Sequence, residues 1–107
     1  MATAEEVFTE IDTRLKGDPS KIGSLNATYA FDLDGANYHI VLKDGQGEAG
    51  AGEPTDPNIT ITMKSDDFVD LATGKLDGTM AFMSGKLKIK GDMGLAMKLQ
   101  GLLRNNN

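Results

Sequence analysis

The spacing of apolar residues changes near residue 27, and this change restricts the fold more than any other feature of the sequence. Before it, apolar side chains recur at the intervals of one helix face, at Val7, Phe8, Ile11 and Leu15. Thr3 and Glu6 stand at capping-box spacing ahead of this series, and Gly17 is a typical helix end. After residue 27 the apolar positions alternate with polar ones, as in a strand with one buried face. The sequence therefore predicts an amphipathic helix followed by a sheet that needs cover on one face.

Two alternating series flank the turn at residues 34–35 and predict a β-hairpin. Their inward positions are Tyr29, Phe31, Leu33, Tyr38, Ile40 and Leu42. A glycine-rich turn at residues 44–47 leads to a weaker third strand near residues 48–51, after which Pro54 and Pro57 interrupt regular structure. The glycines at 45, 47 and 50 have the spacing of a dinucleotide fingerprint, but prolines follow them where that motif needs a helix. We therefore interpret this stretch as a plain hairpin.

The rest of the chain alternates twice more, and each time a helical pattern follows. Residues 59–63 predict a fourth strand, Ser65 is the expected cap of a helix ending at Gly74, and residues 79–84 form a short helical stretch. Residues 86–90 predict a fifth strand, and Asp92 is placed to cap a last helix over residues 93–103. This order predicts one α+β domain over residues 1–104, with a five-stranded, mixed and mostly antiparallel sheet and the helices on one face. We expect residues 105–107 to form a frayed tail.

The residue inventory argues against catalysis. The chain has no cysteine and one histidine, His39, which excludes thiol nucleophiles, disulfides, structural zinc and paired-histidine metal sites. His39 falls on the polar side of its strand, where a solvent-side histidine is a simpler interpretation than a hydrolytic site. We predict that the protein is not an enzyme and holds no cofactor or metal.

Charge is distributed unevenly along the chain. Residues 1–74 carry five Lys and Arg against fourteen Asp and Glu, a net charge of −9, whereas residues 75–107 carry six against two, a net of +4. The overall charge of −5 and the absence of aromatic residues among the C-terminal lysines argue against a nucleic-acid partner. No apolar run approaches the roughly 20 residues of a membrane span, and the N-terminus does not have the pattern of a signal peptide. We therefore expect a soluble, cytoplasmic protein.

Two patterns in the basic part each allow two interpretations. The lysines of the fifth strand either protect a sheet edge or attract an anionic head group or membrane surface. In the last helix, Met93 and Met97 lie roughly opposite an apolar face formed by Leu95, Ala96, Leu99, Leu102 and Leu103. Together with Met80 and Met83, these methionines either pad an ordinary core or line an adaptable apolar cavity.

Residues 86–100, Lys-Leu-Lys-Ile-Lys-Gly-Asp-Met-Gly-Leu-Ala-Met-Lys-Leu-Gln, resemble the sterol carrier protein 2 family, also called nonspecific lipid-transfer proteins. Residues 59–63, 67–68, 73–76 and 81–87 fit this family in the same order, as do residues 7–15 and 43–47. The resemblance therefore covers nearly the whole chain. Two departures are Tyr38, where other members carry Trp, and an end without the peroxisomal tripeptide, which favours a cytoplasmic location.

The resemblance implies an apolar tunnel between helices and sheet that accepts fatty acids, fatty acyl-CoAs, sterols or phospholipids, in a domain without catalysis. By position, Leu15 and Met93 resemble tunnel residues of the family. The inward-face pattern adds further expected lining residues, namely Phe8, Ile11, Ile40, Phe68, Leu76, Met80, Met83 and Met97. The expected head-group or membrane-facing cations are Lys86, Lys88, Lys90 and Arg104.

These inferences predict a monomer that binds lipids and transfers them within the cell, with transient contact to a membrane surface. The alternative is a protein-interaction or regulatory module that has kept the fold and filled its cavity.

Overall fold

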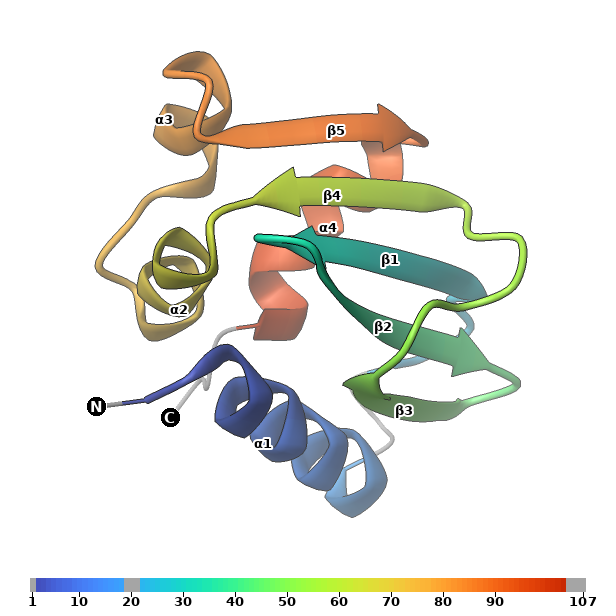
Figure 1. The fold of residues 1–107 in the computed structure, drawn as a ribbon. Helices are drawn as coiled ribbons and strands as arrows, with labels where there is room; N and C mark the ends of the chain where they lie inside the picture. The colour runs from blue at the N-terminus through green and yellow to red at the C-terminus, as the bar shows by residue number, and fades with distance from the viewer. Residues whose placement is uncertain (1, 19–21, 104–107) are drawn as a thin grey trace.

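The computed structural model describes residues 2–18 and 22–103 and has two layers, a sheet and a set of helices (Figure 1). The helices are α1 (Ala4–Gly17), α2 (Ser65–Thr73), α3 (Gly78–Met83) and α4 (Met93–Leu103). The strands are β1 (Ala27–Leu33), β2 (Ala36–Lys43), β3 (Gln46–Ala51), β4 (Ile59–Met63) and β5 (Leu87–Gly91). Within the described parts, no helix is both long enough and apolar enough to cross a bilayer.

The five strands form one mixed sheet in the order β3-β2-β1-β4-β5, which confirms the predicted fold class. Only the β1–β4 pair is parallel, because residues 52–58 cross from β3 to the far side of β1. Tyr29 stands opposite Ile40 on one side and Ile59 on the other, so the large apolar residues of neighbouring strands share one face. The other face carries polar residues of β4 and β5, with Thr62 opposite Lys88 and Thr60 opposite Lys90.

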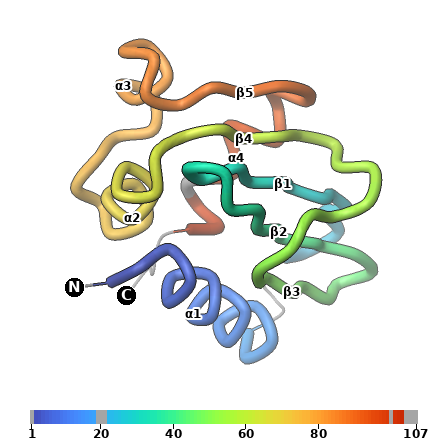
Figure 2. The backbone as a smooth tube through the Cα atoms, in the orientation of Figure 1, coloured from blue at the N-terminus to red at the C-terminus, as the bar shows by residue number. Residues whose placement is uncertain are grey.

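Three helices cover the apolar face, and Figure 2 shows α4 passing behind β4 and β1 while α1 lies beside β3. The space between α1, α2 and the sheet is filled by aromatic rings. Phe8 of α1 stacks on Tyr38 and on Phe68, with ring centroids 4.6 and 4.9 Å apart, and meets Phe31 edge-on at 5.1 Å. Such pairs stabilise a core by roughly 0.5–1.5 kcal/mol each beyond the area they bury.

The observed N-termini of the helices can be compared with the predicted N-cap residues. The capping box at Thr3 and Glu6 is confirmed, since each side chain accepts a hydrogen bond from the other residue's backbone N–H. Asp92 also caps α4 as predicted, accepting from the Gly94 and Leu95 N–H groups at 2.8 and 3.3 Å. The prediction for Ser65 is wrong, because Ser65 is the first helical residue.

The Ser65 N–H donates to the Asp34 carboxylate at 2.8 Å, because the β1–β2 turn lies beside the start of α2, where Leu33 pairs with Met63. A carboxylate 31 residues away in sequence therefore accepts a hydrogen bond from a free backbone N–H at the start of α2. Local sequence spacing could not reveal this contact.

Close approach of α1 to β3 depends on Gly47. A Cβ atom at this position would lie 2.9 Å from the Ile22 Cδ1 atom and 3.1 Å from the Leu15 Cδ1 and Leu42 Cδ2 atoms. The same two elements are joined by Asp12, whose carboxylate accepts from the Ala49 N–H at 3.0 Å and from the Lys16 ammonium at 2.9 Å. Strand β3 therefore has few large side chains, because α1 packs directly on it.

Gly47→Ala should lower the free energy of unfolding by roughly 1–3 kcal/mol, because the added methyl overpacks this contact. The matched control is Gly101→Ala in α4, where a Cβ atom meets nothing within 4 Å. This control should raise stability by about 0.5–1 kcal/mol, because Ala favours helix over Gly. Urea unfolding of both variants measures the two changes, and a Gly47→Ala protein as stable as the parent would contradict the packing argument.

Candidate functional site

Helix α4 lies on the apolar face of the sheet and is held there by leucines and two hydrogen bonds. Leu95, Leu99 and Leu103 are buried. The Tyr29 hydroxyl donates to the Leu95 carbonyl at 2.8 Å, and the Arg14 guanidinium donates to the Leu103 carbonyl at 2.9 Å. The two sides of α4 that the sequence separates differ in burial, but Met93 and Met97, which were expected in a core or lining a cavity, are exposed.

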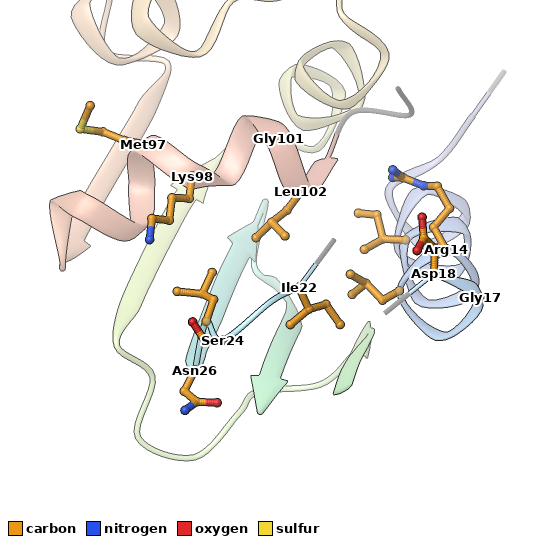
Figure 3. Close-up of a pocket in the computed structure, with 13 residues that line it drawn as sticks. Arg14, Gly17, Asp18, Ile22, Ser24, Asn26, Met97, Lys98, Gly101 and Leu102 are labelled. Carbon is orange, nitrogen blue, oxygen red and sulfur yellow. The ribbon is translucent and has the colours of Figure 1, made fainter. Parts of the chain in front are cut away.

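A hollow of about 1080 Å³ lies on the α1 side of this helix, between α4, the end of α1 and residues 22–26. In Figure 3, Leu102 and Lys98 project from α4 toward that segment, and Ile22 lies between α4 and α1. We call it the α1–α4 hollow. Its lining combines apolar and polar side chains, formed by Ile11, Arg14, Leu15, Gly17, Asp18, Ile22, Ser24, Leu25, Asn26, Met97, Lys98, Gly101 and Leu102.

A smaller groove of about 240 Å³ lies on the other side of α4, between this helix, α3 and β5. We call it the α3–α4 groove. Nearly all of its lining is apolar, formed by Leu71, Gly78, Thr79, Phe82, Leu87, Ile89, Met93, Ala96, Met97 and Leu99. Met97 lines both spaces and, in Figure 3, its thioether points away from α1. Helix α4 therefore separates two spaces that reach the same side chain.

The ten predicted lining residues are not gathered around one cavity. Five of them belong to the packed core, namely Phe8, Ile11, Leu15, Ile40 and Phe68, and of these Ile11 and Leu15 also border the α1–α4 hollow. Leu76 is half-buried against the core. The other four, Met80, Met83, Met93 and Met97, are exposed, and Met93 and Met97 line the α3–α4 groove.

The predicted cations fall elsewhere. Lys86, Lys88 and Lys90 are exposed at β5, which forms one edge of the sheet, and none of them lines either space. Arg104 lies outside the described residues. The structure instead places Lys98 in the lining of the α1–α4 hollow. Sequence reasoning missed Lys98, although its place beside Met97 in the last helix was a usable signal.

His39 lies on the polar face of the sheet and is half-buried. Its Nδ1 atom is 3.1 Å from the Gly52 carbonyl oxygen, which can only accept, so this nitrogen donates. Across residues 2–18 and 22–103, no group of three or more His, Asp or Glu side chains is placed to hold a metal ion.

Comparison with known proteins identifies the fold and the family. The sequence model of the SCP-2 sterol transfer family matches residues 8–104. The chain belongs to this family. It is 44% identical over 107 residues to hydroxysteroid dehydrogenase-like protein 2 of Xenopus tropicalis, a match that covers 96% of this chain and 25% of that protein. The chain thus spans about a quarter of the length of the curated relatives it matches.

Two solved structures from insects show the same SCP-2 fold. Sterol carrier protein domain 2 of Helicoverpa armigera superposes with a TM-score of 0.77 and 31% identity, over 94% of this chain and 86% of that one. Sterol carrier protein 2 of Aedes aegypti, solved in complex with the C16 fatty acid palmitate, superposes with a TM-score of 0.75 and 22% identity, over 96% of each chain.

The ionisation of the buried Tyr29 hydroxyl is a probe of how α4 packs against the sheet. Burial, and secondly the nearby Asp92 carboxylate, which disfavours another negative charge, together raise the pKa of Tyr29 to about 12. Tyrosine in the unfolded chain ionises near pH 10, so between about pH 10 and 12 the unfolded state loses a proton that the folded state keeps. The free energy of unfolding should therefore fall as the pH rises through this window.

Tyr29→Phe should lose about 0.5–1.5 kcal/mol of stability at neutral pH, where only the hydrogen bond is missing. As the pH rises from about 9 to about 12, the parent should lose up to roughly 2–3 kcal/mol relative to this variant, enough to cancel or reverse the difference seen at neutral pH. Tyr38→Phe is the control, since Tyr38 is half-buried and stacks on Phe8. A constant difference between the parent and Tyr29→Phe across this window would contradict the assignment.

Proposed function

We propose that this domain binds lipids and transfers them, and that the apolar part of the ligand lies along α4. The observation that carries this proposal is the position of α4 between two spaces that share Met97. Displacement of α4 from the sheet would join these spaces into one continuous channel with an apolar part along α4. The channel would be floored by Tyr29 and bordered by the leucines that now face the sheet.

Helix α4 is suited to such movement because little of its stability is intrinsic. It contains Gly94 and Gly101, each of which disfavours a helix by roughly 0.8–1 kcal/mol relative to Ala. An eleven-residue helix of this kind depends on its tertiary contacts. By contrast, α1 has a complete capping box and fourteen residues. We therefore assign the movable cover to α4 and the fixed wall to α1.

The family supports the same function. The sterol carrier protein 2 of Aedes aegypti was solved with palmitate bound, and this chain shares its fold. Fatty acids are thus the first ligands to test, followed by fatty acyl-CoAs, sterols and phospholipids. We propose that the domain carries these molecules without transforming them, as a cytoplasmic monomer that meets membranes transiently. The domain in longer relatives would present its ligand to the rest of the chain.

An acidic head group would find its partner in Lys98. This ammonium group is exposed and belongs to the lining of the α1–α4 hollow, beside Met97 on the same helix. The lysines at β5 are then available for the alternative use, protection of the sheet edge or contact with an anionic membrane.

A second candidate function, a protein-interaction module with a filled cavity, is favoured by one observation. The rings of Phe8, Phe31, Tyr38 and Phe68 occupy the interior between α1, α2 and the sheet. Native mass spectrometry of freshly purified protein separates the two functions. Co-purified lipid favours the carrier, and a lipid-free chain that also fails to take up added fatty acid favours the interaction module.

Met97→Asp should weaken the binding of a fluorescent fatty acid at least about tenfold, because it places a charge beside the apolar chain of the ligand. Met97 is exposed, so the variant should keep the fold. The control is Thr62→Asp on the opposite face of the sheet, which should bind as the parent does. Displacement of the probe by palmitate gives both affinities. Equal loss in the two variants, or saturable binding in neither the parent nor the control, would defeat the proposal.

Lys98→Glu should weaken palmitate roughly three- to tenfold, because an attraction at a solvent-exposed site becomes a repulsion. Its affinity for the neutral alcohol hexadecanol should change little. The matched control is Lys88→Glu, an exposed lysine of β5 that lines neither space. If Lys88→Glu loses palmitate binding and Lys98→Glu does not, the head group binds at the β5 lysines and the assignment to Lys98 is wrong.

A further inference from the structure

Four of the six methionines are exposed to solvent, two on α3 and two on α4. Their exposed fractions are 64% for Met80, 77% for Met83, 49% for Met93 and 84% for Met97. Met63, in contrast, is buried in the core with 5% of its surface exposed. Among the described residues, the only other large apolar side chain with comparable exposure is Phe82, which lies on α3 among them. Phe82, Met93 and Met97 line the α3–α4 groove, whereas Met80 and Met83 lie on α3, one of the two helices that border it.

Such exposure makes methionine chemistry relevant, because an accessible thioether is oxidised by peroxides without a catalyst. The chain has no cysteine, so no thiol competes for the oxidant. Oxidation converts a flexible apolar side chain into a polar one. These four side chains contribute little to the core, so the fold should survive their oxidation while the groove changes from apolar to polar.

We propose that the four exposed methionines form a peroxide-sensitive modification site, and that oxidation of Met93 and Met97 closes the α3–α4 groove to apolar ligands. In the reaction, a thioether sulfur attacks the terminal oxygen of a hydroperoxide, the O–O bond breaks and an S–O bond forms. The sulfur is oxidised by two electrons, the peroxide is reduced to the alcohol, or to water for hydrogen peroxide, and the hydroperoxide proton moves to the departing oxygen. The consequence for binding rests on the function proposed above.

The first measurement does not depend on lipid binding. The folded protein is treated with hydrogen peroxide at neutral pH, and peptide mass spectrometry locates each added oxygen. Met80, Met83, Met93 and Met97 should be oxidised at least about tenfold faster than Met63, because the core shields the Met63 thioether. Equal rates at the buried and exposed positions would overturn the proposal.

The second measurement compares fatty acid binding before and after treatment. The oxidised parent should bind at least about tenfold more weakly, because sulfoxides in the groove would lose hydrogen bonds to water when an apolar chain covers them. The variant with all four exposed methionines changed to Leu should have the same affinity before and after peroxide. Met63→Leu should remain as sensitive as the parent.

Circular dichroism of the treated parent tests whether the fold is intact. Undiminished binding by the oxidised, folded parent would overturn this proposal and leave the lipid function standing. Absence of binding in the untreated parent would instead defeat the lipid function, while the oxidation pattern would still be informative.

Discussion

Phe8 stands where α1, α2 and the sheet meet, and its packing decides which part of the interior is open. Its ring stacks on Tyr38 and Phe68 and meets Phe31 edge-on, so one side chain joins two helices and two strands. These rings occupy the α1–α2 end of the apolar face. The two spaces at the other end border α4, where leucines rather than aromatic rings meet the sheet.

Tyr29 connects these two ends of the molecule. It sits on the same strand face as Phe31, but its hydroxyl extends toward α4 and donates to the Leu95 carbonyl. A buried phenol needs an acceptor, so removal of α4 would leave this hydroxyl to water or to a ligand. The hydrogen bond therefore favours the closed position of α4 in the empty protein, and a ligand that offers an acceptor at the same place would reduce the penalty for opening.

Much of the fold could be predicted because its signals are local. Alternation between residues 27 and 63, the capping box at Thr3 and the cap at Asp92 each depend on neighbours in sequence, and the structure confirms them. The Asp34 contact to α2 could not be predicted, because it joins residues far apart in the chain.

The site was harder to predict for a related reason. Amphipathic spacing identifies which side of a helix is apolar, and it correctly separated Leu99 from Met97. It does not say whether an inward residue such as Phe8 packs against others or borders a cavity, since ring-to-ring fit is a tertiary property. Lys98 was overlooked because the alternating lysines of β5 gave a stronger local pattern, although those lysines lie away from both spaces.

The free energies of the apolar surfaces decide whether α4 can act as a cover. Full exposure of Leu95, Leu99 and Leu103 would cost roughly 5–9 kcal/mol, if each buried leucine is worth about 1.5–3 kcal/mol. Transfer of an acyl chain of about 15 carbons out of water contributes on the order of 12 kcal/mol, before the ordering costs of binding. A long acyl chain can therefore compensate for displacement of the helix, and a short one cannot. In the proposed function, the domain would select its ligands by apolar length first, and Lys98 would add a smaller preference for acids.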